Sequence, residues 1–217
     1  MNKWRLSLFL LSFLSLAVSL SDGTAQSTPP KVDAGDSTFA LVSREVGTWN
    51  WAYTCTAVAI AQQDAKTLLL TASHCIFPQR VYAIAPDRSA EWLAEAMIES
   101  VAVQADLAVI SVRQLLPVTA IGVSPQVGDV VTAVGWPRGS SKMLYYGFVS
   151  GYTTEPGVNI LTVYMPGLEP GLSGSGLFCK GQQAICGVVV GLYNASPAFG
   201  AAEPISKYRD AEWLSRK

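Results

Sequence analysis

The sequence predicts an all-β protein built mainly from antiparallel strands. From Thr38 onward, short runs rich in valine, isoleucine, alanine, threonine and aromatic residues alternate with turn residues. Short strands at near-regular spacing, with little helical periodicity between them, are typical of antiparallel β proteins. The expected strands are Cys55–Ile60, Thr67–Thr71, Val81–Ala85, Leu107–Val112, Val130–Val134, Leu144–Ser150, Ile160–Val163 and Ala184–Val190.

Three segments depart from this strand pattern. Residues 90–98 contain helix-forming residues, but they could equally form a strand and a hairpin. Residues 205–217 place apolar side chains between charged ones, which predicts a C-terminal amphipathic helix. Prolines and a glycine interrupt residues 113–125, so we expect a seam between two halves of the protein there.

The first 25 residues have the layout of a secretory signal peptide. Lys3 and Arg5 precede the apolar stretch Leu6–Leu20, and small residues lead to a cleavage site after Ala25. An uncleaved anchor helix is the alternative, although the apolar stretch is short for a full membrane span. Residues 26–37 are then a flexible lead-in to a folded domain at 38–204.

Composition excludes several classes of function. The formal net charge is −1 and the charged residues are scattered, so we expect neither a nucleic-acid surface nor, after signal cleavage, a membrane patch. An even number of cysteines, four, in a chain that carries an export signal favours disulfides. With one histidine and no C-x-x-C pair, a zinc site is disfavoured, and no cofactor is expected.

A glycine-rich turn at residues 171–176 is the candidate nucleophile turn. Its small residues can present the Ser173 hydroxyl without crowding, and amides flanked by glycine can point toward a developing oxyanion. A serine between glycines is more often part of an ordinary loop, so this turn indicates catalysis only together with other residues.

His74 and Asp106 are the other candidates. The single histidine follows a predicted strand, and Asp106 directly precedes another. Alone, the histidine would be read as a surface or core residue and the aspartate as a turn or cap residue. However, the chain order His74, Asp106, Ser173 matches one lineage of catalytic triads. Cys55 and Cys75 bracket a predicted hairpin, so a bond between them would fix the segment that carries His74.

These residues carry a resemblance to the chymotrypsin-like serine proteases. Residues 71–75 (TASHC), 106–110 (DLAVI) and 171–175 (GLSGS) look like the three signature blocks of that family. Residues 127–130 (VGDV) and 134–137 (VGWP) further resemble a block of its bacterial branch, the glutamyl-endopeptidase and HtrA-like proteases. The resemblance covers residues 38–204, and no PDZ module is expected after them.

The resemblance implies two six-stranded antiparallel β-barrels, at about 38–116 and 117–204, with the active site in the cleft between them. It assigns His74 as general base and acid, Asp106 as the residue that orients it, and Ser173 as nucleophile. The amides of Gly171 and Ser173 would form the oxyanion hole.

Two residues near the nucleophile depart from the family pattern. Ser175 replaces a second glycine, which leaves it as an alternative, less favoured nucleophile. Leu172 stands where trypsin and its relatives carry an aspartate that pairs with a newly cut N-terminus, so activation by that ion pair is not expected.

The resemblance also suggests a substrate pocket. Gly167 and Leu168 would approach its base, and Val189 with Gly191 would form a wall. None of these residues is charged, which predicts an uncharged residue before the cleaved bond, although Glu169 lies nearby. The strand around Val189 would also offer an edge to an extended peptide.

The second cysteine pair flanks a glycine-containing turn, so we expect a Cys179–Cys186 disulfide, with buried free thiols as the alternative.

These observations predict an exported serine endopeptidase that acts on proteins or peptides. A non-catalytic binding protein on the same scaffold, or an esterase using the same triad, are the alternatives.

Overall fold

The structure is a computed structural model that describes residues 33–86, 93–155, 158–179, 183–193, 196 and 198–206. All of them belong to one compact unit, Lys31–Lys217. The expected signal peptide and most of the lead-in lie outside the described residues. The C-terminal helix gains no support, because Ile205 has no helical assignment and residues 207–217 lie outside the described part.

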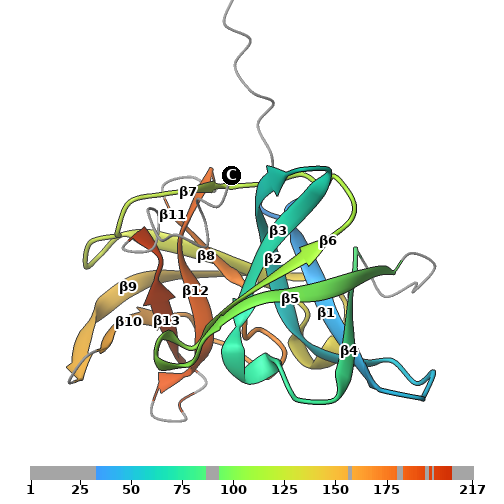
Figure 1. Ribbon diagram of the computed structural model, residues 1–217. Coiled ribbons are helices and arrows are strands. Elements are labelled where there is room, and N and C mark those ends of the chain that lie inside the picture. Colours follow the sequence, from blue (N-terminus) through green and yellow to red (C-terminus); the bar gives the residue numbers. More distant parts are fainter. Residues whose placement is uncertain are drawn as a thin grey trace, which may run out of the picture. The chain divides into compact units, whose positions relative to one another are not determined.

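The first half of the chain forms a closed antiparallel barrel in the strand order β1-β2-β3-β6-β5-β4 (Figure 1). Its interior is filled by apolar side chains that alternate with outward residues along each strand, among them Leu41, Leu69 and Ile110. The strands are β1 (Thr38–Glu45), β2 (Ala52–Gln63), β3 (Lys66–Ala72), β4 (Arg80–Ala85), β5 (Ala94–Ala102) and β6 (Leu107–Val112).

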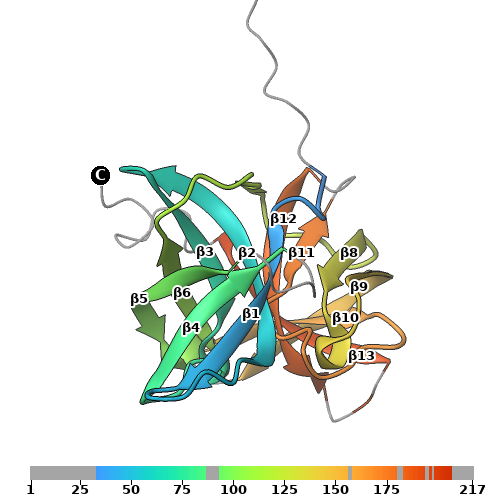
Figure 2. The same cartoon turned by 90° about the vertical axis from the view of Figure 1, so that its right-hand side faces the viewer.

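The second half forms another antiparallel barrel, which lies beside the first (Figures 1 and 2). Its strands follow the order β11-β8-β9-β10-β13-β12, and pairing of β11 with β12 closes the barrel, while the short β7 adds to β12 in parallel. The strands are β7 (Ala120–Ile121), β8 (Val130–Gly135), β9 (Met143–Glu155), β10 (Val158–Tyr164), β11 (Gly176–Cys179), β12 (Ala184–Leu192) and β13 (Phe199–Pro204).

The predicted all-β fold with two six-stranded antiparallel barrels is therefore confirmed. All eight expected strands are present, and the ambiguous stretch at 90–98 contributes a strand, β5, from Ala94 onward. Helical structure in the described residues is limited to 3₁₀ turns, and none of the helices there is long and apolar enough to cross a membrane. The turns are η1 (Ser73–Cys75), η2 (Val103–Ala105) and η3 (Pro137–Gly139).

A shared apolar core joins the two barrels. Val58 and Leu70 of the first barrel and Phe178 and Val188 of the second belong to one cluster of buried side chains. Burial of these side chains from both barrels favours a fixed arrangement of the two halves. Residues contributed by opposite barrels can therefore form one site.

Both expected disulfides are present. Cys55–Cys75 joins β2 to the turn after β3, and Cys179–Cys186 joins β11 to β12. Each links residues whose Cα atoms lie about 6 Å apart, at 6.1 and 5.9 Å, as disulfide geometry requires. No cysteine is free.

Candidate active site

His74 and Asp106 are brought together by the register of two paired strands. Strand β3 ends at Ala72, which lies opposite Leu107, the first residue of β6. The residues just outside this pair therefore meet as well, and the Ser73 amide donates a hydrogen bond to the Asp106 carbonyl at 3.0 Å. The next residue along the chain, His74, therefore lies close to Asp106.

Three hydrogen bonds fix the Asp106 carboxylate. Its Oδ2 lies 2.7 Å from His74 Nδ1, while Oδ1 accepts from the His74 backbone amide at 2.9 Å and from Ser73 Oγ at 2.8 Å. Because an ionised carboxylate only accepts hydrogen bonds, His74 Nδ1 must carry a proton. In the neutral ring Nε2 is then the free proton acceptor. The imidazole is therefore oriented so that Nε2 can act as a base.

The same contacts shift the pKa values of both groups. The hydrogen bond to Asp106 raises the pKa of His74 above 6.5, partial burial opposes this, and attraction to the carboxylate adds to it. Burial alone would raise the pKa of Asp106, but the hydrogen bonds from His74 and Ser73 outweigh it and lower the pKa below 3.8. At neutral pH the carboxylate is charged and stabilises a proton on the ring.

The glycine-rich turn before β11 has a shape that only glycine allows at two positions. Gly171 and Gly174 have φ angles of +100° and +86°. A Cβ on Gly174 would lie 2.0 Å from the Thr56 carbonyl oxygen, and one on Gly171 would lie 2.5 Å from the Trp136 carbonyl oxygen. The turn thus packs against the backbone of both barrels, with Ser173 half-buried between the two glycines.

Two amides of this turn have no acceptor among the described residues. The amides of Leu172, Gly174 and Ser175 all donate within the protein, to carbonyls of Glu169, Val189 and Leu172 respectively. Those of Gly171 and Ser173 donate no hydrogen bond within the described part of the chain. The serine turn can thus supply two N–H donors to a bound group.

The orientation of the Gly171 amide has a visible cause. The preceding carbonyl, that of Pro170, accepts a 2.7 Å hydrogen bond from the Arg138 amide in the turn η3. In a planar trans peptide the N–H points away from its C=O. Holding the Pro170 oxygen toward Arg138 therefore turns the Gly171 N–H in the opposite direction.

Strand β2 links the serine turn to the histidine. The Thr56 amide donates to the Ser173 carbonyl at 2.8 Å, and the residue before it, Cys55, is cross-linked to Cys75, the residue after His74. A ring nitrogen of His74 also lies within 4.8 Å of both sulfur atoms. The structure describes no direct hydrogen bond between the His74 ring and the Ser173 hydroxyl.

This cluster of one histidine and two cysteines is not a metal site, since the disulfide occupies both sulfur atoms. A metal-bound cysteine would need a free thiolate.

Ser175 is excluded as the nucleophile. Its side chain is fully buried, and its hydroxyl has no hydrogen-bond partner in the part of the chain that the structure describes. A Cβ on Gly135 would lie only 2.5 Å from this hydroxyl, so the space around it is filled by protein. A peptide cannot reach it, which leaves Ser173 as the serine that this turn presents.

The candidate pocket residues lie partly in the core of the second barrel. The side chains of Leu168 and Val189 are 3% and 2% exposed and belong to the apolar cluster that fills that barrel. They can form the floor of a pocket but not a wall that projects into solvent. A Cβ on Gly167 would contact Tyr145, a ring that sequence reasoning missed, whereas one on Gly191 would meet nothing within 4 Å.

Glu169 is not a free charge beside this pocket. Its Oε2 lies 3.0 Å from Arg138 Nε in an ion pair that is largely exposed. Leu172, in contrast, is 1% exposed within the core of the second barrel, so this position holds no charge.

Among the described residues, the end of strand β12 has one edge without a backbone partner. Gly191 and Leu192 pair with β13 on one side. On the other side, the backbone pairing of β12 ends at Val189. The Val189 carbonyl accepts a hydrogen bond from the Gly174 amide, and the Val189 amide donates to the Ser175 carbonyl. An extended peptide could add to the remaining edge beside Ser173.

Comparison with known protein families identifies the family to which the chain belongs. The profile of the trypsin-like peptidase domain matches residues 55–192. The chain belongs to this family of serine endopeptidases. The match covers all three candidate residues, from both barrels, and agrees with the resemblance to chymotrypsin-like proteases described above.

Solved structures with the same fold include several proteases. The Rv3671c protease from M. tuberculosis in its active form is 16% identical with a TM-score of 0.68, and the alignment covers 82% of this chain and 80% of that one. The serine endoprotease from Yersinia pestis is 22% identical with a TM-score of 0.68, covering 85% of this chain and 65% of that one.

The HtrA-type protease AlgW with a bound tripeptide is 20% identical with a TM-score of 0.69, covering 85% of this chain and 62% of that one. Identities this low establish the fold, and this chain spans less than two thirds of the Yersinia protease and of AlgW. No curated protein sequence is similar enough to match.

Proposed function

We propose that this protein is an exported serine endopeptidase that hydrolyses peptide bonds through His74, Asp106 and Ser173. The observation that carries the proposal is the His74 ring held by Asp106 on one barrel, tied through Cys55 and Thr56 to the serine turn of the other. A serine hydroxyl needs such a base, because at neutral pH it is a poor nucleophile.

The proposed reaction uses these groups in two similar steps. Ser173 Oγ attacks the carbonyl carbon of the substrate and gives its proton to His74 Nε2, while Asp106 stabilises the resulting imidazolium. The amides of Gly171 and Ser173 donate hydrogen bonds to the oxyanion. The leaving amine takes the proton from His74, and water then attacks the acyl-enzyme by the same route.

We further propose that the residue before the cleaved bond is uncharged, either small and aliphatic or aromatic. The side chains of Leu168 and Val189, which the family resemblance places at the pocket, are apolar and lie in the core of the second barrel, and Glu169 is already paired with Arg138. An unpaired charge beside such side chains would lose its hydration without compensation. Cleavage profiling on a mixed peptide library tests this, and strict cleavage after arginine or glutamate would contradict it.

The export proposal rests on the N-terminal signal pattern and is consistent with the two disulfides, which persist in oxidising compartments. N-terminal sequencing of the protein recovered from outside the cytoplasm should begin at Gln26. An intact N-terminus on a membrane-bound product would instead favour the anchor helix.

One experiment separates the proposed enzyme from a binding protein of the same fold. A fluorophosphonate probe, which reacts with activated serines, should label the protein at Ser173, and Ser173→Ala should abolish the labelling. Intact mass measurement locates the adduct. Absence of labelling in a folded protein would favour a binding role, and turnover of esters but not of peptides would favour an esterase.

A further inference from the structure

Thr56 forms hydrogen bonds with several parts of the candidate site. It lies fully buried in strand β2. Its amide donates to the Ser173 carbonyl at 2.8 Å, and its hydroxyl donates to the Gly171 carbonyl at 2.9 Å. The same hydroxyl accepts from the Trp136 amide at 3.4 Å. One residue of the first barrel thus holds two residues of the serine turn.

The hydroxyl restrains a residue that has little restraint of its own. Glycine accesses a wide range of φ and ψ angles, so Gly171 at φ +100° does not keep one orientation by itself. The Arg138 amide fixes the peptide unit before Gly171, and the Thr56 hydroxyl fixes the one after it. Together these two hydrogen bonds determine where the Gly171 amide points.

Protein atoms pack closely against the hydroxyl on the side of Gly135. A Cβ on the neighbouring Gly135 would lie 2.8 Å from Thr56 Oγ1 and 2.5 Å from Ser175 Oγ. If the Thr56 hydroxyl were removed, the Gly171 carbonyl would lose its donor at a partly buried position. A partly buried carbonyl that loses its partner favours rotation of the peptide toward another donor.

We propose that Thr56 is a positioning residue for the oxyanion hole. Its hydroxyl keeps the Gly171 amide directed at the substrate oxyanion, while its own amide keeps the Ser173 backbone in place. This inference rests on the proposed function, since it assigns the Gly171 amide a role in catalysis. The backbone bond survives any substitution other than proline, so the hydroxyl can be tested by itself.

The test compares three variants. Thr56→Val keeps the shape of the side chain and removes the hydroxyl, and Thr56→Ser keeps the hydroxyl and removes a methyl group. Thr67→Val is the matched control, because Thr67 is also a fully buried threonine whose hydroxyl bonds two backbone groups, the Gln114 carbonyl at 2.6 Å and the Leu116 amide at 3.0 Å.

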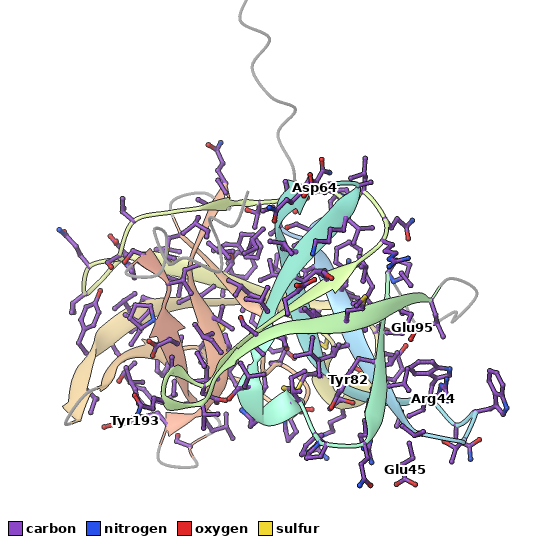
Figure 3. The ribbon with its side chains drawn as sticks, in the orientation of Figure 1. Arg44, Glu45, Asp64, Tyr82, Glu95 and Tyr193 are labelled. Atoms are coloured by element: carbon purple, nitrogen blue, oxygen red, sulfur yellow. A yellow bond between two sulfur atoms is a disulfide. The ribbon has the colours of Figure 1, made fainter. Side chains whose placement is uncertain are left out.

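The control lies far from the serine turn. Thr67 is near the start of β3, close to the β2–β3 turn that Asp64 marks in Figure 3, whereas His74 follows the other end of that strand. Thr67→Val therefore reports what the loss of a buried hydroxyl does to the fold alone.

We expect Thr56→Val to lower kcat about tenfold with KM within about twofold of the wild type, since a misdirected donor costs less than a lost one. The inhibition constant of a peptide boronic acid, whose hydroxyl occupies the oxyanion hole, should rise about tenfold as well. Thr56→Ser should restore both values to within about threefold. Thr67→Val should lower the melting temperature but leave kcat and inhibition within about twofold.

The inference is overturned if Thr56→Val keeps the wild-type kcat and boronate inhibition, if Thr56→Ser is as impaired as Thr56→Val, or if Thr67→Val loses activity equally. The proposed function fails in a different way, when the wild-type protein is not labelled at Ser173 and turns over no peptide. Measuring wild-type labelling first keeps the two failures apart.

Discussion

Removal of the Cys55–Cys75 disulfide should cost both stability and catalysis. The perturbation is the double substitution Cys55→Ala and Cys75→Ala. The bond closes a loop with a sequence separation of 20, for which the chain-entropy relation gives about 3 kcal/mol of unfolding free energy. Both sulfur atoms are buried, so the two truncations add roughly 1 kcal/mol through the space they leave.

The second disulfide provides the comparison. Cys179–Cys186 has a separation of only 7, so Cys179→Ala with Cys186→Ala should cost about 2.5 kcal/mol by the same relation, plus a similar truncation cost. Urea unfolding followed by tryptophan fluorescence measures both losses, because the chain contains six tryptophans.

The two double-cysteine variants should differ in kcat. Loss of the Cys55–Cys75 bond frees the residue next to His74, so kcat should fall by about tenfold or more, because small misplacements of a catalytic group are costly. Loss of the other bond should change kcat by no more than about threefold where the protein is fully folded. The reasoning is refuted if the first double variant keeps full activity, or if it unfolds at the wild-type urea concentration.

Three further predictions concern the site. The ratio kcat/KM should fall as the pH drops through a pKa above 6.5, since only neutral His74 can accept a proton. Asp106→Asn should move this inflection to lower pH and reduce kcat. A wild-type inflection below pH 6.5 would contradict the raised pKa of His74. Gly174→Ala should abolish activity and lower the melting temperature, because its Cβ would clash with backbone, whereas Gly151→Ala, which meets nothing within 4 Å, should be neutral in both assays. Glu169→Gln should change the unfolding free energy by no more than about 1 kcal/mol and leave cleavage preference unchanged, because this carboxylate is exposed and already paired; a new preference in library profiling would contradict that.

Much of the fold was predictable because its strands are strongly patterned. Leu107–Val112 has identical bounds in the sequence prediction and in the structure, as expected of six consecutive apolar or small residues. Strand β13 had no comparable signal. Its segment, Phe199–Pro204, contains alanine, glycine and glutamate, and its strand form comes from pairing with β10 and β12 on either side.

The candidate site likewise contains some residues that the sequence could indicate and others that it could not. Chain order and local motifs pointed to His74, Asp106 and Ser173, and to both disulfides, because these residues sit in short recognisable segments. Thr56 had no such signal, since its proposed role depends on contacts with residues more than 100 positions away, such as Gly171 at a separation of 115 residues. Burial of the Leu168 side chain likewise depends on the closure of the second barrel.

The chain contains a single imidazole, and it is the one bonded to Asp106. Isotopic labelling of histidine would therefore give one set of ring nitrogen signals in a magnetic resonance spectrum, with no assignment required. Tautomer, protonation and the arrival of an inhibitor could all be read from those signals in the unmodified wild-type protein. The proposed catalytic histidine therefore serves as a spectroscopic probe without any modification of the protein.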